Sequence, residues 1–126
     1  MTSMYTLRAL RGAVCSENNQ EEIKKRTVEL YDRLLKDNEL AETELVSLFF
    51  SVTADLTALN PASALRKAGR AGEAAIMVFQ EAEYIDSLAG TIRVLIHCYM
   101  DNQKPLRHVY CYGAEKLRPD RTFIGG

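Results

Sequence analysis

The sequence predicts an α+β domain, with α/β as the alternative, in which helices cover one face of a mixed β-sheet. Three observations support this class. Apolar, β-branched segments recur along the chain, as buried strands require. Two segments with helical periodicity lie between the first three of these strands. At 126 residues the chain is long enough for one hydrophobic core and too short for two, so we expect a single domain over residues 1–126.

A first strand is predicted over residues 4–11, because apolar and polar residues alternate there. The side chains that share its apolar face are Tyr5, Leu7, Ala9 and Arg11. A polar loop follows, in which Asn19 and, three residues later, Glu22 predict a capped helix start. The helix continues with residues at helical spacing, namely Ile23, Thr27, Leu30, Tyr31, Leu34 and Leu35.

The second strand is predicted over residues 45–53, and its near-continuous apolar character indicates that both of its faces are covered. A short second helix follows. Asn60 is its predicted N-cap, Pro61 takes the first helical position, and Gly69 marks its end. Asparagine side chains cap free backbone N–H groups, and proline has no N–H to leave unpaired there.

Three further strands complete the predicted sheet. They cover residues 74–83, residues 90–100, and residues 107–117, the last as one strand or as two short ones. Little in the sequence anchors the C-terminal tail, so we expect residues 120–126 to be mobile or to become ordered over a bound ligand.

The composition is that of an ordinary globular protein, with 47% hydrophobic and 26% charged residues. A net charge of -1 argues against nucleic acid or an acidic membrane surface as a partner. The three cysteines, Cys15, Cys98 and Cys111, show no CxxC spacing and suit reduced thiols. With no signal-like start and no apolar run of about 18 residues, we expect a cytoplasmic protein.

The sequence contains no recognisable nucleophile–base or metal-binding pattern. Its two histidines, His97 and His108, lie in predicted strands outside any catalytic signature, and each is better explained as a structural residue. No third ligand stands at a telling interval from them, so no metal site is predicted. Neither a GxGxxG motif nor a P-loop is present, and no nucleotide cofactor is expected.

Arginine is the residue type that points to a function. Arg93 interrupts the apolar stretch GTIRVLIHCYM, where an unpaired guanidinium would cost several kcal/mol to bury. It therefore needs a carboxylate, such as Glu81 or Glu83 on the preceding strand, or an anionic ligand. Arg11 and Arg93 together favour a pocket for a small dicarboxylate, because the planar guanidinium grips carboxylates in a bidentate manner. Arg66 and Arg118 are as well explained by a solvated surface as by a ligand.

Several motifs occur together in a recognisable order. They are LRALRGA followed by EEI, SVTADL with NPASALR, QE in the third strand, IRV in the fourth, and then RHVY and LRPD. In this set, which spans about residues 6–120, the chain resembles the AroH-class chorismate mutases. The resemblance implies a homotrimer whose sheets form a central pseudo-α/β-barrel, with active sites between subunits. It also implies the Claisen rearrangement of chorismate to prephenate, in phenylalanine and tyrosine biosynthesis, with no cofactor.

The resemblance also implies roles for individual residues. Arg93 would donate to the ether oxygen of the breaking bond and to a carboxylate, Arg11 would bind a carboxylate, and Glu81 would accept from the ring hydroxyl. Tyr110 would bind a carboxylate, with Arg66 and Arg118 as cations at the mouth. The other matched substrate-binding positions are Leu117, Asn60, Ala62, Ser63, Met77 and Val78.

Three of these positions depart from the family's pattern. Asn60 stands where an apolar aromatic residue is common, Ser63 where a lysine is common, and Val78 where a cysteine is common. The missing lysine removes a cation near the entrance, which would affect substrate affinity more than chemistry.

The implied reaction agrees with the residue inventory, because a unimolecular rearrangement needs no nucleophile, base or metal. It needs a fixed conformer of the substrate and positive charge near the ether oxygen. The alternative is a trimeric module, non-enzymatic or similar to small deaminases, that binds a carboxylate between subunits. The joint presence of Arg11, Glu81, Arg93 and Tyr110 favours the mutase.

Overall fold

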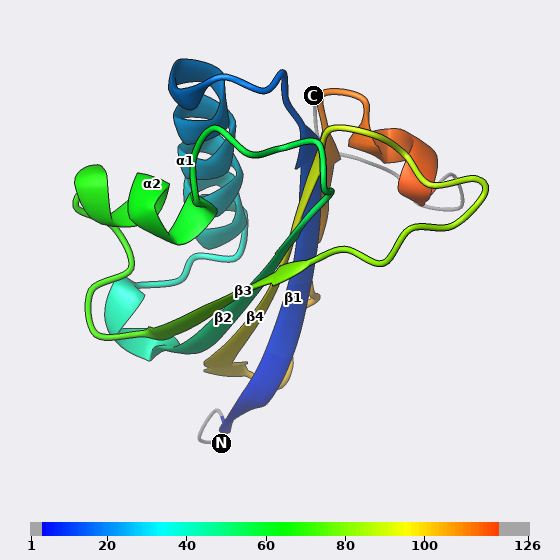
Figure 1. Cartoon of the computed structure of the whole chain (residues 1–126). Coiled ribbons are helices and arrows are strands. Elements are labelled where there is room, and N and C mark those ends of the chain that lie inside the picture. The colour runs from blue at the N-terminus through cyan, green and yellow to red at the C-terminus, as the bar shows by residue number, and fades with distance from the viewer. Residues whose placement is uncertain (1–3, 119–126) are drawn as a thin grey trace.

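A computed structural model describes residues 4–118, which form a five-stranded mixed sheet with two α-helices on one face (Figure 1). The strands are β1 (Tyr5–Cys15), β2 (Leu45–Val52), β3 (Ala75–Gln80), β4 (Thr91–Asp101) and β5 (Val109–Cys111). Their order across the sheet is β3-β2-β4-β1-β5. β4 pairs antiparallel with both β1 and β2, whereas β3 and β5 add parallel edges. The predicted α+β class is confirmed.

The helices are α1 (Gln20–Asp37) and α2 (Pro61–Lys67), and both begin at the predicted caps. The Asn19 side chain accepts a hydrogen bond from the backbone N–H of Glu22 at 2.8 Å, and the Asn60 side chain accepts one from that of Ala62 at 2.8 Å. Gly69, just beyond α2, has a positive φ of 72°, as expected of a glycine that ends a helix.

The hydrophobic core lies between these helices and one face of the sheet. Its fully buried members include Leu10, Ile23, Leu30, Leu34, Leu48, Phe50, Leu65, Ile92 and Ile96. Gly12 lets α1 pack closely on β1, because a Cβ at this position would lie 2.9 Å from Cδ1 of both Leu30 and Leu34. The same Cβ would lie 3.0 Å from the carbonyl oxygen of Val109 on β5.

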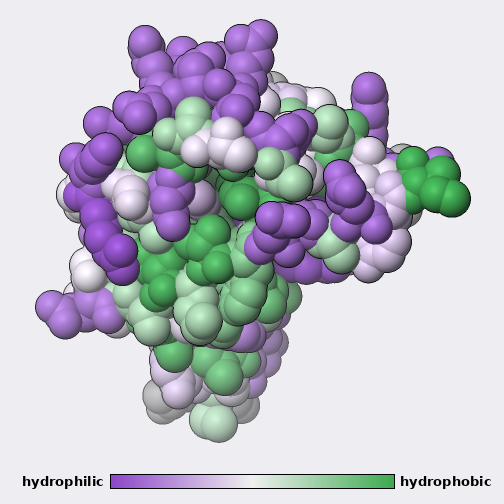
Figure 2. All heavy atoms as spheres, in the orientation of Figure 1, coloured by the Kyte–Doolittle hydropathy of each residue, from purple (hydrophilic) through white to green (hydrophobic). Residues whose placement is uncertain are grey.

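Among the described residues, η2 (Ala114–Leu117) and Tyr110 cover only the part of the opposite sheet face around Ala13, and the rest of this face carries large apolar side chains. Five large apolar side chains on this open face are 48% to 60% exposed, namely Tyr5, Leu7, Met77, Phe79 and Tyr99. Figure 2 shows apolar residues gathered on the lower half of the molecule and mainly hydrophilic residues toward α1. The prediction that β2 is covered on both faces is therefore wrong for the single chain.

All five strands differ from their predicted bounds at one end or both, although β2 ends only one residue early. β1 continues past Arg11 to Cys15, because Gly12, without a side chain, leaves room for α1 and β5 while the strand stays paired with β4 and β5. β3 ends at Gln80, three residues early, and β4 starts and ends one residue late. In the last segment the strand stops at Cys111, because Tyr112 and Gly113 take positive φ angles of 54° and 100°. A 3-10 helix, η2 (Ala114–Leu117), follows.

Within residues 4–118, no helix is long and apolar enough to cross a membrane. The tail predicted to be mobile, residues 120–126, lies outside the described residues.

Candidate active site

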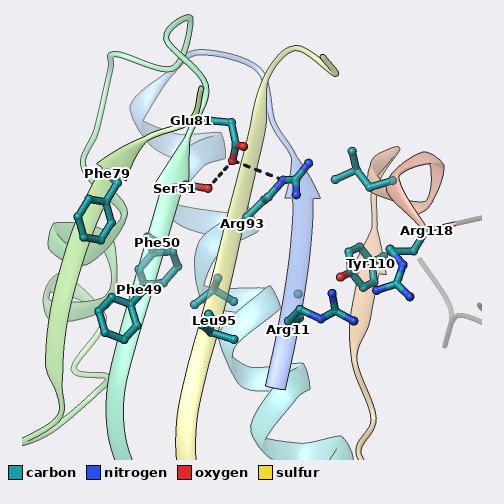
Figure 3. Close-up of a pocket in the computed structure, with 13 residues that line it drawn as sticks. Arg11, Phe49, Phe50, Ser51, Phe79, Glu81, Arg93, Leu95, Tyr110 and Arg118 are labelled. Atoms are coloured by element: carbon teal, nitrogen blue, oxygen red, sulfur yellow. Dashed lines mark hydrogen bonds and ion pairs between the residues drawn. The ribbon is translucent and has the colours of Figure 1, made fainter. Parts of the chain in front are cut away.

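A cleft of about 360 Å³ opens on the uncovered face of the sheet, between the central strands and η2 (Figure 3). Its volume lies within the range of about 300–1,000 Å³ that is usual for small-molecule sites. The residues whose side chains define it are Arg11, Phe49, Ser51, Phe79, Glu81, Arg93, Leu95, Tyr110, Leu117 and Arg118. Six of the twelve predicted site residues are among them.

Arg93 lies near the centre of this cleft. On β4 it is directly opposite Ser51 of β2 on one side and Ala13 of β1 on the other. Its side chain is 47% exposed, so the interpretation that this guanidinium is buried is wrong. The two-residue period of the strand explains the difference: Ile92 and Val94 point to the core, and Arg93 points to the open face.

Glu81 is the acidic residue of the cleft and the partner of Arg93. Its Oε1 lies 3.5 Å from Nε of Arg93 and accepts a 2.6 Å hydrogen bond from Oγ of Ser51. The backbone N–H of Glu81 donates to the carbonyl oxygen of Val52 at 2.8 Å, which holds the residue beside β2 after β3 has ended. Of the two predicted partners for Arg93, Glu81 forms the ion pair, whereas Glu83 lies exposed in the following loop.

Ser51 was missed by the sequence reasoning. The signal was present, because it is a polar residue that interrupts the apolar run of β2. Such a residue in a central strand points to the open face or to a buried hydrogen bond. Which of these applies depends on the pairing of β2 with β4, which is not visible in the run itself.

Arg11 and Tyr110 reach the cleft from β1 and β5. Arg11 is paired with Leu95 of β4, and its backbone N–H donates to Nδ1 of His108 at 2.9 Å. Tyr110 is opposite Ala13 of β1 and is 6% exposed. His108 therefore acts here as an acceptor for a strand, in agreement with its structural interpretation. Figure 3 shows Arg11, Tyr110 and Arg118 together on the β1 and β5 side of Arg93.

The remaining predicted site residues lie outside this cleft. Asn60, Ala62, Ser63 and Arg66 belong to α2 and its cap, on the covered face of the sheet (Figure 1). Met77 and Val78 are on β3, where Met77 is 55% exposed on the open face and Val78 packs against the core. Within one chain the predicted site is thus divided into a cleft group and an α2–β3 group.

The charges in the cleft suit an anion with more than one carboxylate. Among the described residues, three guanidinium groups, those of Arg11, Arg93 and Arg118, and one carboxylate, that of Glu81, line the cleft. Guanidinium groups bind carboxylates through two parallel hydrogen bonds. Phe49, Phe79 and Leu95 supply an apolar wall that a carbon ring can contact.

None of the three cysteine thiols, the strongest nucleophiles among the described side chains, lines this cleft. Burial raises the pKa of Cys98 and of Cys111 to about 11, so both thiols are protonated at neutral pH. Burial likewise raises the pKa of Cys15. Between residues 4 and 118, no group of three or more histidine, cysteine, aspartate or glutamate side chains is arranged to hold a metal ion.

Comparisons with known proteins agree with this chemistry. The family model of chorismate mutase type I matches residues 7–121. Chorismate mutase AroH of Bacillus subtilis (strain 168) is 32% identical over 116 residues, which cover 90% of this chain and 91% of that protein. Chorismate mutase AroH of Thermus thermophilus is 37% identical over 117 residues, which cover 90% and 95% respectively.

The fold gives the same result. The solved structure of a chorismate mutase from Clostridium thermocellum superposes with a TM-score of 0.79 and 34% sequence identity, and the match covers 86% of this chain and 98% of that one. A family match over nearly the whole chain, relatives above 30% identity and a shared fold lead to one conclusion: the chain belongs to the chorismate mutase type I family.

Proposed function

We propose that the cleft on the open face is where this chorismate mutase converts chorismate into prephenate. The observation that carries the proposal is the convergence of Arg11, Glu81, Arg93 and Tyr110 from four separate segments into one cleft. A dianionic ring compound matches its three guanidinium groups and its apolar wall. The assignment of each residue follows the family match and the position of that residue in the cleft.

The rearrangement breaks the ether C–O bond of chorismate while a new C–C bond forms, and no proton has to move. As the C–O bond lengthens, negative charge develops on the ether oxygen, and a preorganised cation there lowers the barrier. Arg93 is proposed for this role. The closest contact of its guanidinium with Glu81 is made by Nε, and the two terminal nitrogens are proposed to bind the ether oxygen and a carboxylate.

The other residues hold the substrate in its folded, reactive conformation. Arg11 and Tyr110 bind a carboxylate, Glu81 accepts a hydrogen bond from the ring hydroxyl, and Arg118 adds positive charge beside Leu117 at the rim. Fixing one reactive conformer removes much of the entropic part of the barrier, and for a unimolecular reaction this is a large share of catalysis.

We also propose that the chain works as a homotrimer with shared sites. The open face exposes apolar side chains that a second copy would cover, and apolar patches of this kind mark association surfaces. Asn60, Ala62, Ser63 and Arg66 lie on the covered face, away from the cleft of their own chain, and Met77 and Val78 do not line that cleft. In a cyclic trimer the Asn60, Ala62, Ser63, Arg66, Met77 and Val78 group of one subunit would border the cleft of the next.

The proposed activity is tested by adding the purified chain to chorismate and following the loss of chorismate's ultraviolet absorbance, with prephenate identified as the product. Light scattering on the same sample is expected to report about three chains per particle. Binding of chorismate without turnover would favour the carboxylate-binding module instead. A monomer with full activity would contradict the shared site. A cytoplasmic location is proposed as well, supported by the three free thiols.

A further inference from the structure

Ser51 occupies an unusual position in the cleft. Its Oγ donates to Oε1 of Glu81 at 2.6 Å, and this same oxygen lies 3.5 Å from Nε of Arg93. Figure 3 shows the three side chains joined in a row along the upper part of the cleft. One carboxylate oxygen therefore has two partners. Among the described residues, Oε2 of Glu81 accepts no hydrogen bond from a side chain.

The backbone holds the two partners of Oε1 in place. Ser51 and Arg93 are directly opposite each other in the antiparallel pairing of β2 with β4, in the middle of the sheet. Glu81 has no such support, because β3 has ended at Gln80 and the next regular element is β4. Its backbone is tied to β2 by one hydrogen bond, from its N–H to Val52. Glutamate has three rotatable side-chain bonds, so its carboxylate is oriented by the groups that it contacts.

The Ser51 hydrogen bond also limits the interaction between Glu81 and Arg93. A guanidinium and a carboxylate left to themselves favour a bidentate contact in which both oxygens are used. Here Ser51 engages Oε1 from the β2 side, and the closest approach of the guanidinium to that oxygen is through Nε, at 3.5 Å. This arrangement keeps Oε2 available to a ligand.

We propose that Ser51 is a positioning residue for the rearrangement: it orients the Glu81 carboxylate so that Oε2 accepts the hydrogen bond of the substrate's ring hydroxyl. The inference rests on the proposed function, in which Glu81 binds that hydroxyl. Ser51 itself touches neither the ether oxygen nor the carboxylates of the substrate. Its effect is on recognition of the hydroxyl, and this separates it from a residue that only supports the sheet.

The test compares two substrates with each variant: chorismate, and an analogue of chorismate whose ring hydroxyl is replaced by hydrogen. Ser51→Ala is expected to lower kcat/KM for chorismate about tenfold, the scale of one hydrogen bond to a charged group. It is expected to leave kcat/KM for the analogue within about twofold, because without the hydroxyl the orientation of Oε2 no longer matters. Ser51→Thr keeps a donor and is expected to stay near the parent with both substrates.

Ser47→Ala is the matched control. Ser47 lies on the same strand and, like Ser51, is directly opposite a β4 residue, His97, whose Nδ1 is 3.1 Å from the Ser47 hydroxyl. It does not line the cleft. The control is expected to change kcat/KM little with either substrate, while light scattering checks that the assembly of both alanine variants is that of the parent.

Two outcomes would overturn the inference while the parent is active. An equal loss with both substrates would make Ser51 a structural residue, and an unchanged kcat/KM for chorismate would leave it without a role. If Ser51→Ala does not fold, Ser51→Val is compared with Ser51→Thr, since these side chains have the same shape and differ in the hydroxyl. The role would also be refuted if Ser51→Val and Ser51→Thr had the same ratio of kcat/KM for chorismate to kcat/KM for the analogue. A parent with no activity on chorismate would instead reject the proposed function, and the inference with it.

Discussion

Replacing Arg93 by lysine tests the centre of the proposed mechanism. The substitution keeps a positive charge in the cleft and removes the planar fork. In the structure the Arg93 guanidinium reaches Glu81 through Nε at 3.5 Å, and its terminal nitrogens extend further into the cleft. A lysine ammonium has a single nitrogen in place of three. It can pair with Glu81 or approach the ether oxygen, and it cannot do both with arginine's geometry.

The expected magnitudes for catalysis and for stability differ widely. Loss of one preorganised donor to a developing oxyanion costs on the order of 3–4 kcal/mol, which lowers turnover about 100- to 1,000-fold. The folded state depends much less on Arg93, because its side chain is 47% exposed. An ion pair of this exposure contributes about 0.2–1 kcal/mol, and lysine preserves part of that. Arg93→Lys should therefore lose activity and keep its fold.

The assay is the decrease in chorismate's ultraviolet absorbance at saturating substrate, with thermal unfolding of the same sample as the measure of stability. Arg8→Lys is the matched control, since Arg8 donates to the carbonyl oxygens of Asp101 and Lys104 and does not line the cleft. Its turnover is expected to match the parent's. If Arg93→Lys retains turnover within about threefold of the parent, well short of the loss of an oxyanion donor, then the role assigned to Arg93 is wrong.

Three further predictions concern affinity and stability. Ser63→Lys should strengthen chorismate binding by about 0.5–1 kcal/mol, seen as a lower KM with kcat nearly unchanged, because it adds a cation one turn before Arg66 on α2. Salt should reduce this gain, because the new cation is screened by solvent. Gly12→Ala should lower the free energy of unfolding in urea by about 1–3 kcal/mol, because its Cβ would lie within 3.0 Å of α1 and β5 atoms. The stability of the parent should fall as the pH rises from about 9 to about 11. Folding raises the pKa of Cys98 and Cys111 from 9.0 to about 11, so the unfolded chain loses these protons first and is favoured over that range.

Each of these has a result that would contradict it. An unchanged KM for Ser63→Lys at low salt, in a properly folded protein, would separate α2 from the cleft entrance. A urea midpoint for Gly12→Ala equal to that of the parent would show that α1 does not pack on β1 as closely as described. For the thiols, the comparison is a variant with alanine at both Cys98 and Cys111. A decline between pH 9 and 11 as steep as the parent's would assign the effect to other groups.

Local sequence alone determined the kinds of elements and several of their ends. Asn19 and Asn60 cap α1 and α2 as predicted, since capping depends on a side chain and on N–H groups two or three residues away. The five strands were located by their apolar runs, with errors of one residue at the ends of β2 and β4 and larger errors in β1, β3 and β5. Arg11, Arg93 and its possible partner Glu81 were singled out from the sequence itself and Tyr110 from the resemblance, and their roles in catalysis stay predictions.

Tertiary structure decided which side of the sheet each residue faces and which residues share a cleft. Arg93 looked buried because its neighbours in sequence are apolar, whereas the pairing of β4 with β1 and β2 turns it to the open face. Ser51 became a partner of Glu81 through the same pairing. The twelve predicted residues separated into a cleft group and an α2–β3 group because α2 covers the opposite face and β3 lies at the edge of the sheet, where Met77 is on the open face outside the cleft. These outcomes depend on registers between strands up to 97 positions apart, such as Ala13 with Tyr110, and no local pattern encodes such registers.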